Sequence, residues 1–191
     1  MKTPLLVSLP PTFAQYLETA TKRCRYEYRQ APAINHAEVH FDLAQVRYWM
    51  QLWEKQPIAT GFPKWRRYTP ERFENLAKMG ILRVFTCDHA LQMVEKCDDY
   101  IYCHPPLYDK QNQLAKAMWF ALIRWACGKA NWLDLGGGGQ PKRWSDLNRD
   151  SHYKWLYVSK TVAAQPWRVQ VCPCGWRELI SEPHPCSRCA R

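Results

Sequence analysis

Apolar residues recur at helical spacing in several segments, which alternate with shorter segments typical of strands. The spacing predicts helices over residues 12–29, 45–55, 69–79 and 113–127. Gly80 and Gly128 follow the last two of these segments and are typical of helix ends. Pro70 fits the first position of a helix that begins after Thr69.

Short apolar runs and alternating patterns predict strands over residues 37–44, 81–86, 91–96, 100–103, 131–135 and 153–158. The links between the strands from 81 to 103 are short enough for hairpins, so these strands should form an antiparallel meander. The helix 113–127 should then cross over between strands 100–103 and 131–135. This order predicts a mixed α/β (α+β) fold whose site lies where these strands splay, at the start of the crossover helix.

The length of 191 residues suits one domain of about 150 residues and a short appendage. We expect a domain over residues 1–165 and a tail over residues 166–191. With 47% hydrophobic residues and a mean hydropathy of −0.51, the chain should fold as a globular protein. No segment has the ~18 uninterrupted apolar residues of a membrane span, and the N-terminal segment is too interrupted for a signal peptide. A cytosolic protein without a membrane partner is therefore expected.

The charge is strongly basic. Lys and Arg number 27 against 17 Asp and Glu, which gives a net charge of +10. A field of this sign favours an anionic substrate or partner such as DNA, RNA or a nucleotide. The charge alone does not choose among them.

Three short motifs occur in a fixed order in the second half of the chain: IRWACGK at 123–129, NWLDLGGGG at 131–139, and the pair Tyr153-Lys154. In this order they resemble the FemAB-like branch of the GNAT acyltransferases, which includes peptidoglycan aminoacyl transferases. With a similar basic N-terminal helix, the resemblance covers roughly residues 8–160. It implies a GNAT-like mixed sheet and the transfer of an acyl or aminoacyl group to an amine.

The resemblance places Lys154 where a family lysine contacts the donor or polarises the carbonyl under attack, with Tyr153 beside it. A cation there would stabilise the developing oxyanion more than the ground state. A surface lysine on an edge strand is the alternative reading. The glycine run should form a wall of bare backbone at the acyl-transfer crevice, which gives three further substrate-binding candidates: Gly136, Gly137 and Gly138.

The donor site departs from the family pattern. Members that use acyl-CoA carry a Gln or Arg followed by two spaced glycines before the crossover helix. This chain keeps Gln111, a further substrate-binding candidate, but has Leu114 and Lys116 near the glycine positions. Side chains at these positions block a close backbone approach to pyrophosphate, so coenzyme A is not favoured. Lys116 could still hold a phosphate as a point charge. The acyl donor is left open, with aminoacyl-tRNA as one candidate.

Two polar residues near the strand ends are catalytic candidates. His104 ends the meander and is either a general base for the attacking amine or a loop anchor before two prolines. Asp134 either orients the acceptor or caps the turn of the glycine run.

Four cysteines fall within the last twenty residues, at Cys172, Cys174, Cys186 and Cys189. Two close pairs are typical of a structural zinc ribbon. The first pair is one residue shorter than usual, so either all four ligate or His184 replaces one. Four unbound thiols are the remaining alternative. The tail either docks nucleic acid or holds the C-terminus to the core. The docking alternative would use these residues: Trp167, Arg168, Trp176, Arg177, Arg188 and Arg191.

Two function classes follow. The first is an N-acyltransferase that acts on or with an anionic substrate, for example in nucleic-acid modification. The second is a non-catalytic, nucleic-acid-binding adaptor that keeps the GNAT scaffold and reads its partner with the zinc ribbon.

Overall fold

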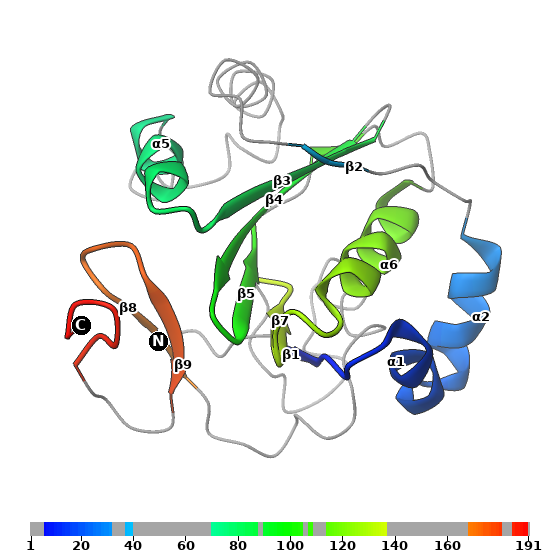
Figure 1. The fold of residues 1–191 in the computed structure, drawn as a ribbon. Coiled ribbons are helices and arrows are strands. Elements are labelled where there is room, and N and C mark those ends of the chain that lie inside the picture. Colours follow the sequence, from blue (N-terminus) through cyan, green and yellow to red (C-terminus); the bar gives the residue numbers. More distant parts are fainter. Residues whose placement is uncertain are drawn as a thin grey trace, which may run out of the picture.

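A mixed sheet forms the centre of the protein (Figure 1). The computed structural model describes residues 6–31, 37–39, 70–87, 90–104, 107–108, 114–136, 168–180 and 185–190. The seven strands of this sheet run in the order β1-β7-β5-β4-β3-β2, and β6 also pairs with β4. Their bounds are β1 Leu6–Ser8, β2 Ala37–Val39, β3 Leu82–Cys87, β4 Ala90–Cys97, β5 Tyr100–Cys103, β6 Leu107–Tyr108 and β7 Trp132–Asp134.

The predicted meander is confirmed. Strands β3, β4 and β5 are successive antiparallel neighbours, with Val84 opposite Met93 and Val94 opposite Cys103. The tight turn between β4 and β5 places Asp98 at a φ of 46°, a left-handed conformation that aspartate tolerates better than most residues.

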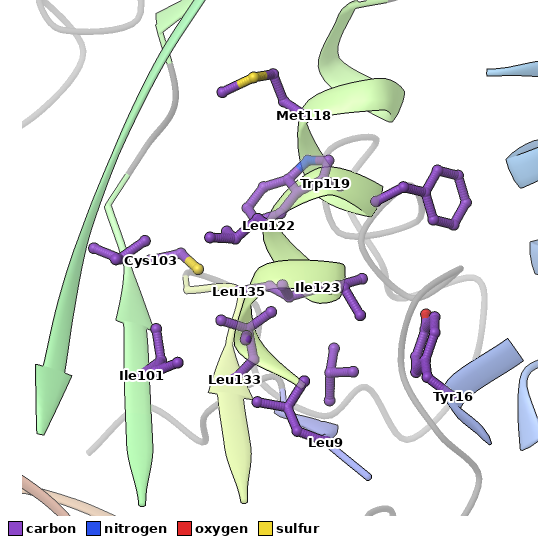
Figure 2. Packing of buried hydrophobic residues seen from close by; sticks show 14 of the residues in the cluster. Leu9, Tyr16, Ile101, Cys103, Met118, Trp119, Leu122, Ile123, Leu133 and Leu135 are labelled. Carbon is purple, nitrogen blue, oxygen red and sulfur yellow. The ribbon is translucent and has the colours of Figure 1, made fainter. Parts of the chain in front are cut away.

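The predicted crossover is also confirmed. Helix α6 (Leu114–Ala126) lies between β5 and β7 in the chain, and these strands pair in parallel, with Tyr102 opposite Asp134. Apolar residues were expected on one face of this helix. Instead Ala117 to Ile123 are buried without interruption, because the sheet covers one side and the N-terminal helices pack against the other (Figures 1 and 2).

The helix predicted over residues 12–29 is in fact two helices, α1 (Phe13–Thr19) and α2 (Lys22–Gln30). Ala20 between them is extended, with ψ at 154°. The Thr21 hydroxyl accepts a hydrogen bond from the backbone N–H of Cys24 at 3.1 Å and so caps a new helix. The prediction of a single helix was wrong. The apolar period continues across residues 20 and 21, but the Thr21 side chain competes with the helix for the backbone N–H of Cys24.

Two short strands of the central sheet were not predicted, and neither were the two strands of the tail. In the central sheet, β1 near the N-terminus pairs antiparallel with β7, and β6, which follows the meander in the chain, pairs with β4. A segment of two or three residues is too short to show an alternation of apolar and polar residues. Such strands therefore cannot be predicted from the sequence pattern and form only beside a partner strand. The helix expected over 45–55, the strand expected over 153–158 and residues 40–44 lie outside the described residues.

Helix α5 (Pro70–Lys78) agrees with the helix predicted over 69–79, and Gly80 follows it with a positive φ of 70°. Its buried Phe73 and Leu76 pack in a second apolar cluster with strands β3 and β4. No helix in the described part of the chain is long and apolar enough to cross a membrane.

The main core lies between α6 and the sheet (Figure 2). Leu122 and Ile123 of α6 pack with Ile101 of β5 and Leu133 of β7, and all four side chains are almost fully buried. Complete burial of each such side chain is worth about 2 kcal/mol, so this layer fixes how β5 and β7 lie beneath the crossover helix.

The C-terminal tail forms a separate antiparallel hairpin of β8 (Arg168–Val171) and β9 (Arg177–Ile180). Strand β9 contacts β5, and Trp176, which is 7% exposed, joins the apolar cluster around Phe73. The tail therefore packs on the core through its own side chains.

Candidate functional site

The parallel pairing of β5 and β7 brings the carboxyl ends of both strands to one edge of the sheet. Gly136 lies there with a φ of 66°, and a Cβ added to it would lie 3.0 Å from the carbonyl oxygen of Cys103. The chain after β7 therefore passes directly over the end of β5, which only glycine permits without displacement. Gly137 and Gly138 lie outside the described residues.

Asp134 is 3% exposed and both of its carboxylate oxygens accept hydrogen bonds. The backbone N–H of Gly136 donates to Oδ1 at 2.8 Å, and the Tyr100 hydroxyl donates to Oδ2 at 2.6 Å. Burial, followed by the charge of Asp134, raises the pKa of Tyr100 well above its ordinary value, so Tyr100 remains a donor. Of the two roles considered for Asp134, the observed contacts match the cap on the glycine turn.

His104 follows β5 and is 1% exposed. Its Nε2 lies 2.8 Å from Glu95 Oε1, and its ring packs at 5.1 Å against the rings of both Phe73 and Tyr102. Burial lowers the pKa of His104, although the Glu95 carboxylate opposes this shift. We therefore assign a neutral imidazole whose Nε2 proton points at Glu95.

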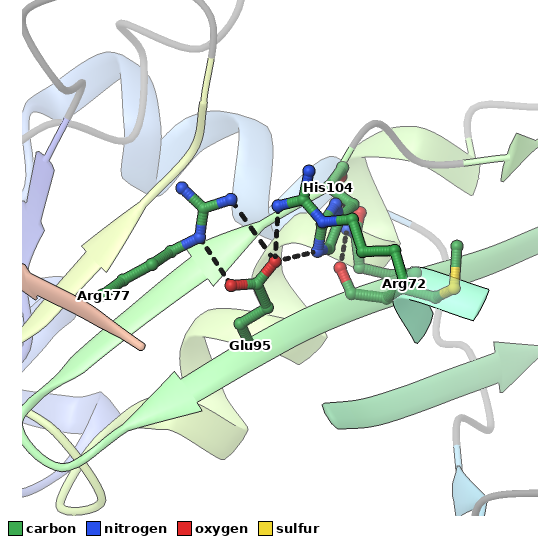
Figure 3. A network of polar contacts seen from close by, with 6 residues as sticks. Arg72, Glu95, His104 and Arg177 are labelled. Atoms are coloured by element: carbon green, nitrogen blue, oxygen red, sulfur yellow. Dashed lines mark hydrogen bonds and ion pairs between the residues drawn. The ribbon is translucent and has the colours of Figure 1, made fainter. Parts of the chain in front are cut away.

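Glu95 is fully buried and is the centre of the polar network in Figure 3. Besides His104, Arg177 donates through Nε to Oε2 and through Nη2 to Oε1 at 3.4 Å, and Arg72 Nη2 lies 3.5 Å from Oε1. Burial alone would raise the pKa of Glu95. The hydrogen bond from His104 and the charge of Arg177 outweigh burial and lower the pKa to about 2. Glu95 is therefore ionised at neutral pH.

Arg177 and Gln92 complete the surroundings of Glu95 and His104. Burial would lower the pKa of Arg177, but the Glu95 carboxylate raises it above its ordinary value, so the pair stays charged. Arg177 also stacks over the Tyr102 ring, with 4.1 Å between Cζ and the ring centroid. Gln92 holds the backbone of the site, since its amide donates to the His104 carbonyl oxygen at 2.6 Å.

Sequence reasoning missed Glu95 and Gln92. A signal was present, because both interrupt the apolar residues of a strand, ALQMVEKC, in which Lys96 is the one other polar residue. A polar side chain buried in such a strand needs a partner. The sequence could not identify that partner. Arg177 lies 82 residues beyond Glu95 in the chain.

Arg177 and Trp176 were candidates for docking nucleic acid, and the structure corrects both. The Arg177 side chain is 11% exposed and faces Glu95, and Trp176 is buried against the core. Neither is available to a partner's phosphates or bases in this arrangement. Arg188 is exposed but lies over the Trp176 ring and donates to the Met79 carbonyl oxygen. Trp167, the side chain of Arg168, and Arg191 lie outside the described residues.

Lys116 lies in the first turns of α6, where it was expected to hold a donor phosphate. Its ammonium group pairs instead with the Glu27 carboxylate of α2. Three further candidates lie outside the described residues: Gln111, Tyr153 and Lys154.

The four tail cysteines come together. The Sγ atoms of Cys172, Cys174, Cys186 and Cys189 all lie within 4.8 Å of one another, with 3.6 Å between Cys172 and Cys189 and 3.9 Å between Cys174 and Cys186. The backbone N–H of Trp176 lowers the pKa of Cys174 to about 7, so a thiolate is accessible near neutral pH. The cluster could hold a metal ion with both close pairs as ligands. His184 lies outside the described residues.

The chain is similar to known proteins in structure but not detectably in sequence. No protein-family model matches the chain, and no curated protein sequence matches it. Among solved structures, the crystal structure of FemX matches with a TM-score of 0.60 and 11% sequence identity, over 82% of this chain and 59% of FemX. The chain thus corresponds to somewhat more than half of FemX. At this identity the match establishes a FemAB-like fold and nothing about the reaction.

Proposed function

We propose that the chain is an N-acyltransferase of FemAB type, which transfers an acyl or aminoacyl group to an amine. The observation that carries this proposal is the fold shared with FemX, with its parallel β5–β7 pair joined by α6. The carboxyl ends of such a pair are where mixed sheets of this kind bind ligands.

In the proposed reaction the amine nitrogen attacks the carbonyl carbon of the donor. A C–N bond forms, the C–O bond of a donor ester breaks, and the amine proton leaves to the departing oxygen or to solvent. We assign polarisation of the carbonyl to Lys154, with Tyr153 binding substrate beside it. His104 is enclosed by core side chains, so we assign it a positioning role at the end of β5.

An aminoacyl ester carried by RNA is the donor that we favour. The net charge of +10 suits a polyanion, while Lys116, the expected phosphate contact for coenzyme A, is engaged with Glu27. The alternative of a nucleic-acid-binding adaptor loses two of its expected contacts, because Arg177 and Trp176 face the core.

We further propose that the tail metal is structural Zn²⁺. In a tetrahedron with Zn–S bonds of about 2.3 Å, the edges between sulfur atoms measure about 3.8 Å. Two of the six edges, at 3.6 and 3.9 Å, fit this geometry, and all four sulfur atoms lie within 4.8 Å of one another. Four thiolate ligands leave no open position for substrate, so the metal would support the fold and take no part in acyl transfer.

The test is a transfer assay with the purified, zinc-loaded chain, aminoacyl-tRNA or acyl-CoA as donor, and a set of amine acceptors read by mass spectrometry. Activity should require the esterified RNA donor and should be lost in Lys154→Met. Lys160→Met is the matched control, since it removes the same charge six residues further along the chain. Absence of transfer from every donor by the folded protein, or full activity of Lys154→Met, would contradict the proposal.

A further inference from the structure

The tail supplies the arginine that lies closest to a buried carboxylate of the sheet. Glu95 is fully buried on β4, and the arginine that approaches it most closely, Arg177, comes from β9 of the tail hairpin (Figure 3). Arg72, the other arginine at Glu95, is 44% exposed and reaches only one oxygen at 3.5 Å. An ionised carboxylate without a close partner in such a position is strongly unfavourable.

The hairpin that carries Arg177 is not expected to be stable by itself. It consists of two strands of four residues each, and an isolated two-stranded hairpin is at best marginally stable in water. Two restraints act on it. First, Cys172 and Cys174 in its turn lie close to Cys186 and Cys189 in the segment after β9. Second, Trp176 packs with Phe73 and Leu76 on the core.

The metal site and Arg177 are close neighbours in the chain. Cys174 precedes Arg177 by three residues, and the backbone N–H of Cys172 donates to the carbonyl oxygen of Trp176 at 2.9 Å. Gly175 completes this tight turn with a φ of 94°. A metal that binds the sulfur atoms of Cys172 and Cys174 therefore also restrains the backbone that positions Arg177.

We propose that metal binding at the four cysteines is coupled to the buried network, so that the occupied site inserts Arg177 beside Glu95 and thereby holds His104 in place. Without metal, the hairpin loosens, Arg177 withdraws, and β4 and β5 lose protection around a buried carboxylate that has lost its closest cation. The tail is then a metal-dependent part of the core. This coupling does not require the reaction proposed above.

The test uses the 191-residue chain, first loaded with Zn²⁺ alone and then stripped with a chelator under reducing conditions. Hydrogen exchange of peptides covering residues 90–104 is compared between the two states. In the natural chain, metal removal should speed exchange there by roughly tenfold or more, because a buried charge loses its partner. In Glu95→Gln the neutral amide needs no counter-charge, so the change should be clearly smaller. Equal acceleration in both proteins, or none in the natural chain, would overturn the proposal.

A second measurement keeps the proposal testable if Glu95→Gln does not fold. Coupling between two sites is reciprocal, so removing the core contact should weaken zinc binding. Competition with a chromophoric chelator should show about tenfold weaker zinc affinity for Arg177→Gln. Arg23→Gln, on the exposed face of α2, is the matched control and should bind zinc as the natural chain does. Unchanged affinity in Arg177→Gln would refute the coupling, and neither result depends on transfer activity.

Discussion

The close passage of the chain over the end of β5 gives the sharpest test of the site geometry. Replacing Gly136 by alanine adds one methyl group at a φ of 66°, 3.0 Å from the Cys103 carbonyl oxygen and 3.8 Å from the Tyr102 ring. The matched control is Gly80→Ala, since Gly80 has nearly the same φ of 70° and nothing lies within 4 Å of its added Cβ.

The two substitutions share one cost and differ in another. A left-handed conformation costs an alanine about 1–2 kcal/mol, and this term applies at both positions. Only at Gly136 must the backbone of β5 also move, and overpacking of this kind adds about 1–3 kcal/mol. We expect Gly80→Ala to lose about 1–2 kcal/mol of unfolding free energy and Gly136→Ala to lose about 2–5 kcal/mol.

Urea unfolding followed by circular dichroism measures both values under the same conditions. The difference between the two variants isolates the contact with Cys103, because the effect of alanine on the unfolded chain cancels. Equal losses in the two variants would refute the inference that the turn after β7 lies directly against β5.

Two further predictions concern the partners of Asp134 and the metal. Tyr100→Phe removes a buried donor to Asp134 and should cost about 1–3 kcal/mol in urea unfolding, whereas Tyr26→Phe, at a 55% exposed tyrosine, should change stability by less than about 0.5 kcal/mol. A loss of the same size in both would mean that the Tyr100–Asp134 bond contributes nothing specific. Cys189→Ser should lose its zinc to a competing chelator, while Cys127→Ser, outside the tail cluster, should retain it. Retention of zinc by Cys189→Ser would exclude Cys189 as a required ligand.

Much of the architecture followed from local patterns. The meander, the crossover helix and its end at Gly128 were predicted because apolar periodicity and turn chemistry act over a few residues. The break between α1 and α2 was missed, since its cause is one hydroxyl at Thr21 rather than a change in period. Strands β1 and β6 were missed because their short sequences gain strand structure only from the partner beside them.

Part of the candidate site could also be predicted from local sequence, and part could not. The cysteine cluster was predicted from spacing, because ligands of one metal must lie close together and the tail places its pairs within a few residues. For Asp134, the turn cap was one of the two roles considered from its position just before the glycine run. The buried network did not, because Glu95, His104 and Arg177 belong to three separate segments whose meeting depends on how the tail packs on the sheet.

The sequence by itself determined the antiparallel meander, the crossover between β5 and β7 and the clustering of the four tail cysteines. Each of these depends on forces between residues that are near neighbours in the chain. Only the tertiary structure decided that the tail contributes to the core. A buried carboxylate needs a partner that is close in space. Trp176 packs in the cluster around Phe73, and Arg177, the next residue in the chain, meets Glu95.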